Sequence, residues 1–160
     1  MRKIVTIIFI GLLLASTAVA GTRSAGYYGI GPRVGFTIDP DQIHFGGHID
    51  FGEIATNLMM VPNLEVGIGD NWTTIAPSFE LDYRFRSDWG VWSPYLGGSA
   101  GPIFYSAKHG DSDTQFGLYI QGGIMKGFSG GNSGYFFLEA KLGLADAPDA
   151  KFTAGWTFSR

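Results

Sequence analysis

The sequence predicts an all-β protein: an eight-stranded antiparallel up-and-down barrel that follows a short leader. Two observations carry this prediction. Side chains alternate with period two through most of the chain after residue 20, and turn-forming residues interrupt the alternation at regular intervals. The composition agrees, because 25 glycines in 160 residues would weaken helices throughout. The absence of cysteine excludes disulfides and thiolate metal sites.

The alternation is clearest near the end of the sequence. Successive side chains of a strand point to opposite faces, so a strand with one apolar face reads as alternating apolar and polar residues. From residue 151 to residue 159, the apolar face consists of Phe152, Ala154, Trp156 and Phe158. The opposite face consists of Lys151, Thr153, Gly155, Thr157 and Ser159. No segment after residue 20 keeps a helical period over such a length.

Eight strands follow from this reading. We predict them over residues 26–38, 42–53, 57–68, 72–86, 90–106, 114–127, 134–145 and 150–159. Residues rich in Gly, Asp, Asn and Pro separate them, and the weakest break is the one near Asn57. Because eight is an even number, the first strand should begin and the last strand should end on the same side of the barrel.

The first twenty residues predict an export signal. Arg2 and Lys3 form a positively charged start, residues 4–14 are largely apolar, and Ala18-Val19-Ala20 is a small-residue cleavage site. The alternative is a membrane anchor, which needs roughly 20 apolar residues, more than this run contains. We therefore predict a signal peptide over 1–20 and a barrel domain over 21–160.

Charge excludes one class of partner. The formal net charge is −3, and loss of Arg2 and Lys3 leaves 9 basic against 14 acidic residues, or −5. No basic patch remains, so we expect no nucleic-acid partner.

The contrast between the two faces predicts which one meets lipid. One face is almost wholly apolar, whereas the other mixes glycines with charges of both signs. A barrel of eight strands has an interior just wide enough for side chains, where opposite charges can pair. We therefore predict a transmembrane barrel with its apolar face toward lipid and a structural polar network in its lumen. The predicted members of that network are Arg33, His48, Asp50, Glu65, Glu80, Arg84, Glu139 and Lys141.

A soluble fold is the alternative. A periplasmic β-sandwich, or a soluble barrel that binds a small apolar ligand, would turn the apolar face inward and leave the charged face in water. Prolines weigh against any closed barrel, because proline removes a donor from the hydrogen-bond ladder and a closed barrel has no edge. Five prolines fall within predicted strands and should mark bulges or strand ends. They are Pro32, Pro62, Pro77, Pro94 and Pro102.

The alternating strands, the leader and the segments 137–144 and 152–158 together resemble those of small OmpA/OmpX-type outer membrane barrels. Segments 46–53 and 94–98 also look like parts of porin-like outer membrane barrel families. The resemblance implies location in the cell outer membrane and contact with membrane lipid and lipopolysaccharide. It also implies insertion by the outer membrane assembly machinery and a monomeric state. The chain departs from the pattern at its end, where Ser159 and Arg160 follow the usual terminal aromatic residue, here Phe158.

We expect no catalytic residue, cofactor or metal ion, and a structural role in the envelope. A lipid A deacylase-like hydrolase is one alternative, but no serine is tied by a motif to His48 and Asp50. His109 lies in a polar loop that we interpret as solvated. His44 and His48 would lie about 13 Å apart along a strand, too far to share a metal. A narrow porin is a second alternative, although passive diffusion of solutes through a filled eight-stranded lumen should be slight.

The first prediction concerns processing. The mature protein should begin at Gly21, because Ala18 and Ala20 satisfy the small-residue preference of the cleavage site. N-terminal sequencing of the protein from the cell envelope measures this directly. Recovery of chains that still begin with Met1 would contradict it.

Overall fold

The computed structural model describes residues 28–85, 90–108, 110, 112–128 and 134–159. The predicted signal peptide and His109 lie outside these ranges. Nine strands are present in the described part: β1 Gly29–Ile38, β2 Gln42–Asp50, β3 Glu53–Ala55, β4 Leu58–Gly69, β5 Trp72–Arg84, β6 Trp92–Ala107, β7 Ser112–Gly127, β8 Gly134–Ala145 and β9 Ala150–Ser159. None of the described residues belongs to a helix long and apolar enough to cross a membrane.

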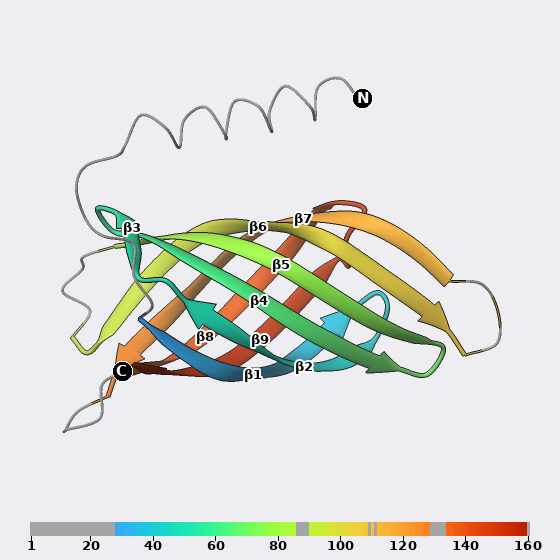
Figure 1. Cartoon of the computed structure of the whole chain (residues 1–160), viewed down its shortest axis with the longest axis horizontal. Helices are drawn as coiled ribbons and strands as arrows, with labels where there is room; N and C mark the ends of the chain where they lie inside the picture. The colour runs from blue at the N-terminus through green and yellow to red at the C-terminus, as the bar shows by residue number, and fades with distance from the viewer. Residues whose placement is uncertain (1–27, 86–89, 109, 111, 129–133, 160) are drawn as a thin grey trace, which may run out of the picture.

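Eight of these strands form a closed antiparallel ring (Figure 1). From β4 to β9, each strand pairs with the next along the chain, and β1 pairs with both β2 and β9. Pairing of β2 with β4, from Gln42 opposite Gly69 to His48 opposite Asn63, closes the ring. Gly29 lies opposite Ser159, so the first strand begins and the last strand ends on the same side of the barrel. The eight-stranded barrel predicted from the sequence is confirmed.

The segment predicted as one strand over 42–53 is divided. Strand β2 ends at Asp50, and the short β3 pairs only with β4, outside the ring. Gly52 separates the two, with φ of 70°, a left-handed conformation that glycine adopts at little cost. The chain nevertheless stays beside β4, because the Phe51 amide donates to the Met60 carbonyl at 3.1 Å. Asn57, at the weakest predicted break, also has positive φ and turns the chain into β4.

The prolines sit where the ladder is interrupted or ends. Pairing of β5 with β6 skips from Ile75–Phe104 to Phe79–Ala100, and the skipped stretches contain Pro77 and Pro102. Pairing of β1 with β9 likewise omits Pro32. Pro62 lies within β4, next to Asn63, where the pairing with β2 stops, and Pro94 lies near the start of β6. A missing donor therefore falls where little pairing is lost.

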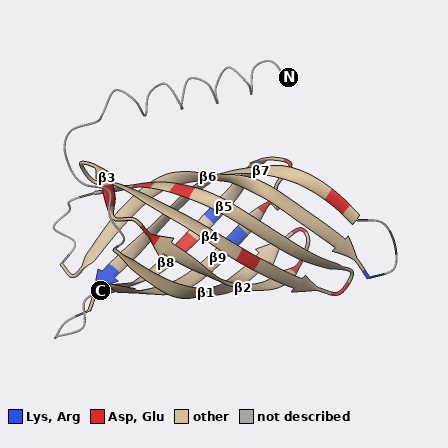
Figure 2. Cartoon of the chain, viewed as in Figure 1, with Lys and Arg blue, Asp and Glu red and all other residues tan. Residues whose placement is uncertain are grey.

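The two faces of the wall differ as the alternation predicts. Large apolar side chains remain exposed on the outer face, whereas charged side chains such as Arg33, Glu80 and Lys141 are buried in the lumen. Figure 2 shows acidic and basic residues within the barrel wall as well as at its ends. Apolar residues fill the lumen on either side of these charges, as β6 shows: inward-facing Tyr95 and Ile103 belong to separate clusters, and buried Ser99 lies between them. An apolar cluster therefore lies on each side of the central charges.

This arrangement predicts how strongly an outward charge should destabilise the barrel in a bilayer. Leu138 lies near the middle of β8 and Leu144 near its end, about 20 Å farther along the strand. Both side chains are exposed on the outer face. Leu138→Arg should cost about 2–4 kcal/mol of folding free energy, and the matched control Leu144→Arg about 0–1 kcal/mol. Reversible unfolding in lipid vesicles measures both values. Equal costs would contradict the prediction that Leu138 lies deeper in the bilayer than Leu144.

Candidate functional site

Charged side chains from five strands meet in the middle of the lumen. We call this set the lumen network; its members are Arg33 on β1, Glu65 on β4, Glu80 on β5, Glu139 and Lys141 on β8, and Lys151 on β9. Every member is buried. Their neighbours along each strand point outward, as Leu64 and Leu138 do, because alternate residues of a strand occupy opposite faces.

Arg33 is the centre of the network. Its Nη1 donates to Glu80 Oε1 at 2.7 Å and its Nη2 donates to Glu80 Oε2 at 3.2 Å, a two-point ion pair. The same Nη1 lies 3.3 Å from Glu65 Oε1, and Nη2 lies 3.9 Å from Glu139 Oε1. One guanidinium therefore faces carboxylates from three different strands.

Two lysines complete the network. The Lys141 ammonium is hydrogen-bonded to Glu80 and lies 3.5 Å from Glu139 Oε1. The Lys151 ammonium is hydrogen-bonded to Glu65. Since a charge in a low-dielectric interior is costly without a partner, these pairs are what make the buried charges tolerable.

Some glycines leave room for polar side chains that lie against them inside the lumen. A Cβ atom on Gly97 would stand 2.1 Å from Asp82 Oδ1, and one on Gly123 would stand 2.6 Å from the Tyr95 hydroxyl. Tyr95 uses that space to donate to Glu139 Oε2 at 3.0 Å. The many glycines of the sequence thus have a steric purpose at these two positions.

Five of the eight predicted network residues meet in the lumen network, and three do not. Asp50 accepts hydrogen bonds from the Tyr135 hydroxyl at 2.8 Å and from the Gly52 amide at 2.6 Å. Arg84 is half-buried and donates to Met59 Sδ at 2.8 Å. Both residues end their strands, so they lie beyond reach of the central charges.

The third separate residue is His48, whose Nε2 lies 2.8 Å from Thr157 Oγ1. His44 is also held by hydroxyls, at 2.9 Å from Thr37 and 3.1 Å from Thr153. Each histidine thus has its own partners. Thr157 is fully buried, so the His48–Thr157 contact offers no nucleophile to a substrate at the barrel surface.

Two residues at the centre of the lumen are absent from the predicted network. Lys151 lies on the polar face of its strand and stands opposite Lys141 in the β8–β9 pairing. Asp82 lies two residues after Glu80 and so points inward with it. The alternation that predicts an inward-facing Glu80 therefore also predicts an inward-facing Asp82. The same reasoning predicts an inward-facing Lys151.

Two small cavities lie in the lumen, and each measures about 10 Å³. One is lined by Glu80, Asp82 and Glu139 among others, and the second by residues that include His44, Glu65 and Lys151. A volume of this size holds about one water molecule.

Comparison with known proteins supports the fold. No family model and no curated protein sequence matches the chain. Several solved structures resemble it in fold. The crystal structure of Neisserial surface protein A aligns with a TM-score of 0.63 and 11% identity, over 86% of this chain and 98% of that one. The N-terminal β-barrel domain of Pseudomonas aeruginosa OprF aligns with a TM-score of 0.58 and 16% identity, over 84% and 99%.

The third structure is the Yersinia pestis outer membrane protein Ail in a phospholipid bilayer nanodisc. It aligns with a TM-score of 0.51 and 10% identity, over 83% of this chain and 99% of that one. Each likeness spans nearly the whole of the other chain. The resemblance to small OmpA/OmpX-type barrels is therefore confirmed as a resemblance of fold.

The pairing of Lys151 with Glu65 generates a prediction. Lys151→Met should lower the free energy of unfolding by about 3–5 kcal/mol, because it leaves a buried carboxylate short of a partner. Glu65→Gln combined with Lys151→Met should recover most of that loss. The exposed Lys108→Met serves as a control and should change stability by less than about 0.5 kcal/mol. Chemical unfolding in detergent micelles measures these three variants and Glu65→Gln alone, which completes the double-mutant cycle. Additive effects of the two lumen substitutions would show that the pair is uncoupled.

Proposed function

We propose that this protein is an integral outer membrane β-barrel with a structural role in the cell envelope. The observation that carries the proposal is the exposure of large apolar side chains over the outer wall. Ile43, Phe79 and Leu144 are each about two-thirds exposed, at 67%, 66% and 67%. Monomeric soluble proteins rarely expose contiguous apolar surface on this scale, whereas a lipid bilayer would cover it.

Aromatic pairs on the outer face support the same placement. Phe36 and Phe152 stack with ring centroids 5.0 Å apart, and Phe136 and Trp156 lie 5.2 Å apart. The first pair lies toward the end of the barrel where β1 ends and β9 begins. The second pair lies toward the opposite end, where β8 begins and β9 ends. Girdles of aromatic residues at the two membrane interfaces are typical of outer membrane barrels.

Membrane lipid and lipopolysaccharide are the partners that this surface fits. Export through the predicted signal peptide and insertion by the outer membrane assembly machinery would deliver the barrel there. Closure of the ring within one chain supports a monomer, because no strand of the ring needs an edge partner.

The alternative functions have less support. A soluble barrel that binds an apolar ligand needs an apolar interior, and the centre of this lumen holds charged residues. A narrow porin needs a continuous water column, and the cavities here have room for about one water each. A lipid-modifying hydrolase needs a nucleophile that acyl chains can reach, and the buried Thr157 is not one.

Membrane fractionation tests the proposal. The protein should sediment with outer membranes, and its migration on a gel should change on heating, because folded barrels survive detergent at room temperature. Planar bilayer recordings with the purified protein should show at most small, rare conductance events, because a barrel of eight strands has room inside for little more than its own side chains. Recovery in the soluble periplasmic fraction would contradict the membrane location. Large, steady conductance would favour the porin alternative.

A further inference from the structure

A single charged side chain lies on the outer wall of the eight described ring strands. Strand β7 alternates at this point: Met125 is buried in the lumen, and its neighbour Lys126 is exposed on the outer face. Every other charged residue in these strands lies on the inward-facing side of its strand. A lysine on the lipid face is costly at the middle of a bilayer and nearly free at its borders, so the height of Lys126 decides what it contacts.

The rest of β7 fixes that height. The outward residues between Thr114 and Lys126 are all apolar or glycine; they are Phe116, Leu118, Ile120, Gly122 and Ile124. Thr114 and Lys126 lie about 40 Å apart along the strand, which is about 30 Å in height at the usual strand tilt. The apolar band of outer membrane barrels is about 25 Å tall. Lys126 therefore lies at one border of the apolar wall, at the level of lipid headgroups.

Aromatic rings surround Lys126 at that border. Its Nζ lies 5.7 Å from the centroid of the Trp92 ring on β6, and Phe136 on β8 stands opposite it on the other side. Trp156 stands opposite Phe136 in turn. A cation above an indole face is attracted by the ring, and tryptophan favours the interface between lipid and water. The contact with Trp92 thus holds the lysine charge against the wall.

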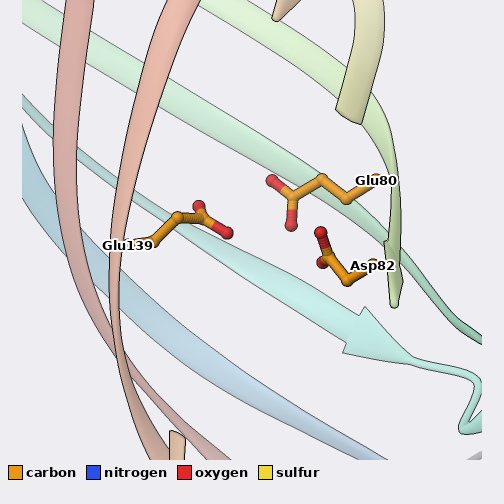
Figure 3. A group of neighbouring side chains, drawn as sticks. All are labelled: Glu80, Asp82 and Glu139. Atoms are coloured by element: carbon orange, nitrogen blue, oxygen red, sulfur yellow. The ribbon is translucent and has the colours of Figure 1, made fainter. Parts of the chain in front are cut away.

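The protein supplies no counter-charge for this lysine among its described residues. Lys126 takes part in none of their ion pairs. The carboxylates of Glu80, Asp82 and Glu139 lie close together inside the barrel (Figure 3), and the wall separates them from the outer face. The anions that a bilayer offers at the level of Lys126 are lipid phosphates.

The opposite border of the wall differs in charge. Its outward residues on β5, β6 and β7 are Thr73, Ser106 and Thr114, which carry hydroxyls only. The described turns beyond this border contain one lysine, Lys108, and several aspartates. The aspartates are Asp39, Asp41, Asp70, Asp146 and Asp149. Their negative charge repels anionic headgroups, so any attraction for such lipids is confined to the border at Lys126.

We propose that Lys126, supported by Trp92, binds the phosphate of an anionic phospholipid of the phosphatidylglycerol class. The acyl chains would lie against the apolar wall beside Ile124, and the phosphodiester carries the one negative charge that one lysine can balance. In a zwitterionic phospholipid the lipid's own ammonium competes for the phosphate. Lipid A carries more than one phosphate, and this border offers a single cation. The proposal rests on the membrane location proposed above and adds the class of lipid that the barrel selects.

Fluorescence quenching by brominated lipids tests the site next to the lysine. The reporter protein keeps Trp92 as its one tryptophan, with Trp72, Trp89 and Trp156 changed to Phe, and is folded into phosphatidylcholine vesicles. Brominated phosphatidylglycerol should occupy the place beside Trp92 roughly fivefold more often than brominated phosphatidylcholine at the same mole fraction. Lys126→Gln should reduce this preference to about one, and Lys126→Arg should keep it.

The matched control is Lys108→Gln, which removes the same charge from an exposed lysine at the opposite end and should leave the preference unchanged. Equal quenching by the two lipids, or equal loss of preference in Lys126→Gln and Lys108→Gln, would overturn the site. Stronger quenching by brominated lipid A would assign the phosphate to lipopolysaccharide and make the phospholipid wrong. Failure to enter vesicles of either composition would refute the membrane location itself, and the site with it.

A second measurement needs no tryptophan substitution and so covers a reporter that fails to fold. Native mass spectrometry of the wild type, released from micelles that contain equal amounts of phosphatidylglycerol and phosphatidylcholine, counts the lipids that stay bound. The wild type should retain phosphatidylglycerol roughly fivefold more often, and Lys126→Gln should retain the two lipids equally. Equal retention by the wild type would overturn the proposal.

Discussion

Closure of the hydrogen-bond ladder between β2 and β4 is the constraint on which the rest of the structure depends. A ring of eight strands has no edge, so its backbone polar groups pair within the wall and the outside can be wholly apolar. The same ring sets an interior only as wide as its inward side chains. Both the exposed apolar exterior and the crowded charged lumen are consequences of that geometry.

The lumen network solves the problem that this narrow interior creates. Arg33 reaches Glu65 and Glu80 across the barrel, and contacts of this kind join strands that are not neighbours in the ring. Buried ion pairs are not by themselves strongly stabilising, because desolvation offsets much of the attraction. Their value here is that a strand shifted by one residue would turn its charges toward lipid. The network therefore favours a single register around the ring.

Prolines and the glycine that divides a strand lie where they remove few hydrogen bonds from the ladder. Pro77 and Pro102 share one interruption of the β5–β6 ladder, so two missing donors disturb a single stretch of pairing. Gly52 separates β2 from β3 while Phe51 keeps its bond to β4. A closed barrel thus accommodates residues that would end a strand elsewhere, provided that each falls at a gap or near a strand end.

The sequence by itself determined the strand count, the turns and the face on which each residue lies, because alternation with period two is a local property of an extended chain. It placed Arg33, Glu80 and Lys141 inside for that reason. Only the tertiary structure decided which inward residues meet. Arg33 and Glu80 are 47 residues apart, and Lys151 and Glu65 are 86 apart, so their contact depends on the closure and stagger of the ring. Alternation gives the direction of Asp50 and Arg84 but not their height in the barrel, and height separates them from the network. The contact between Asp82 on β5 and Gln121 on β7 likewise depends on the register of strands that are not neighbours in the ring.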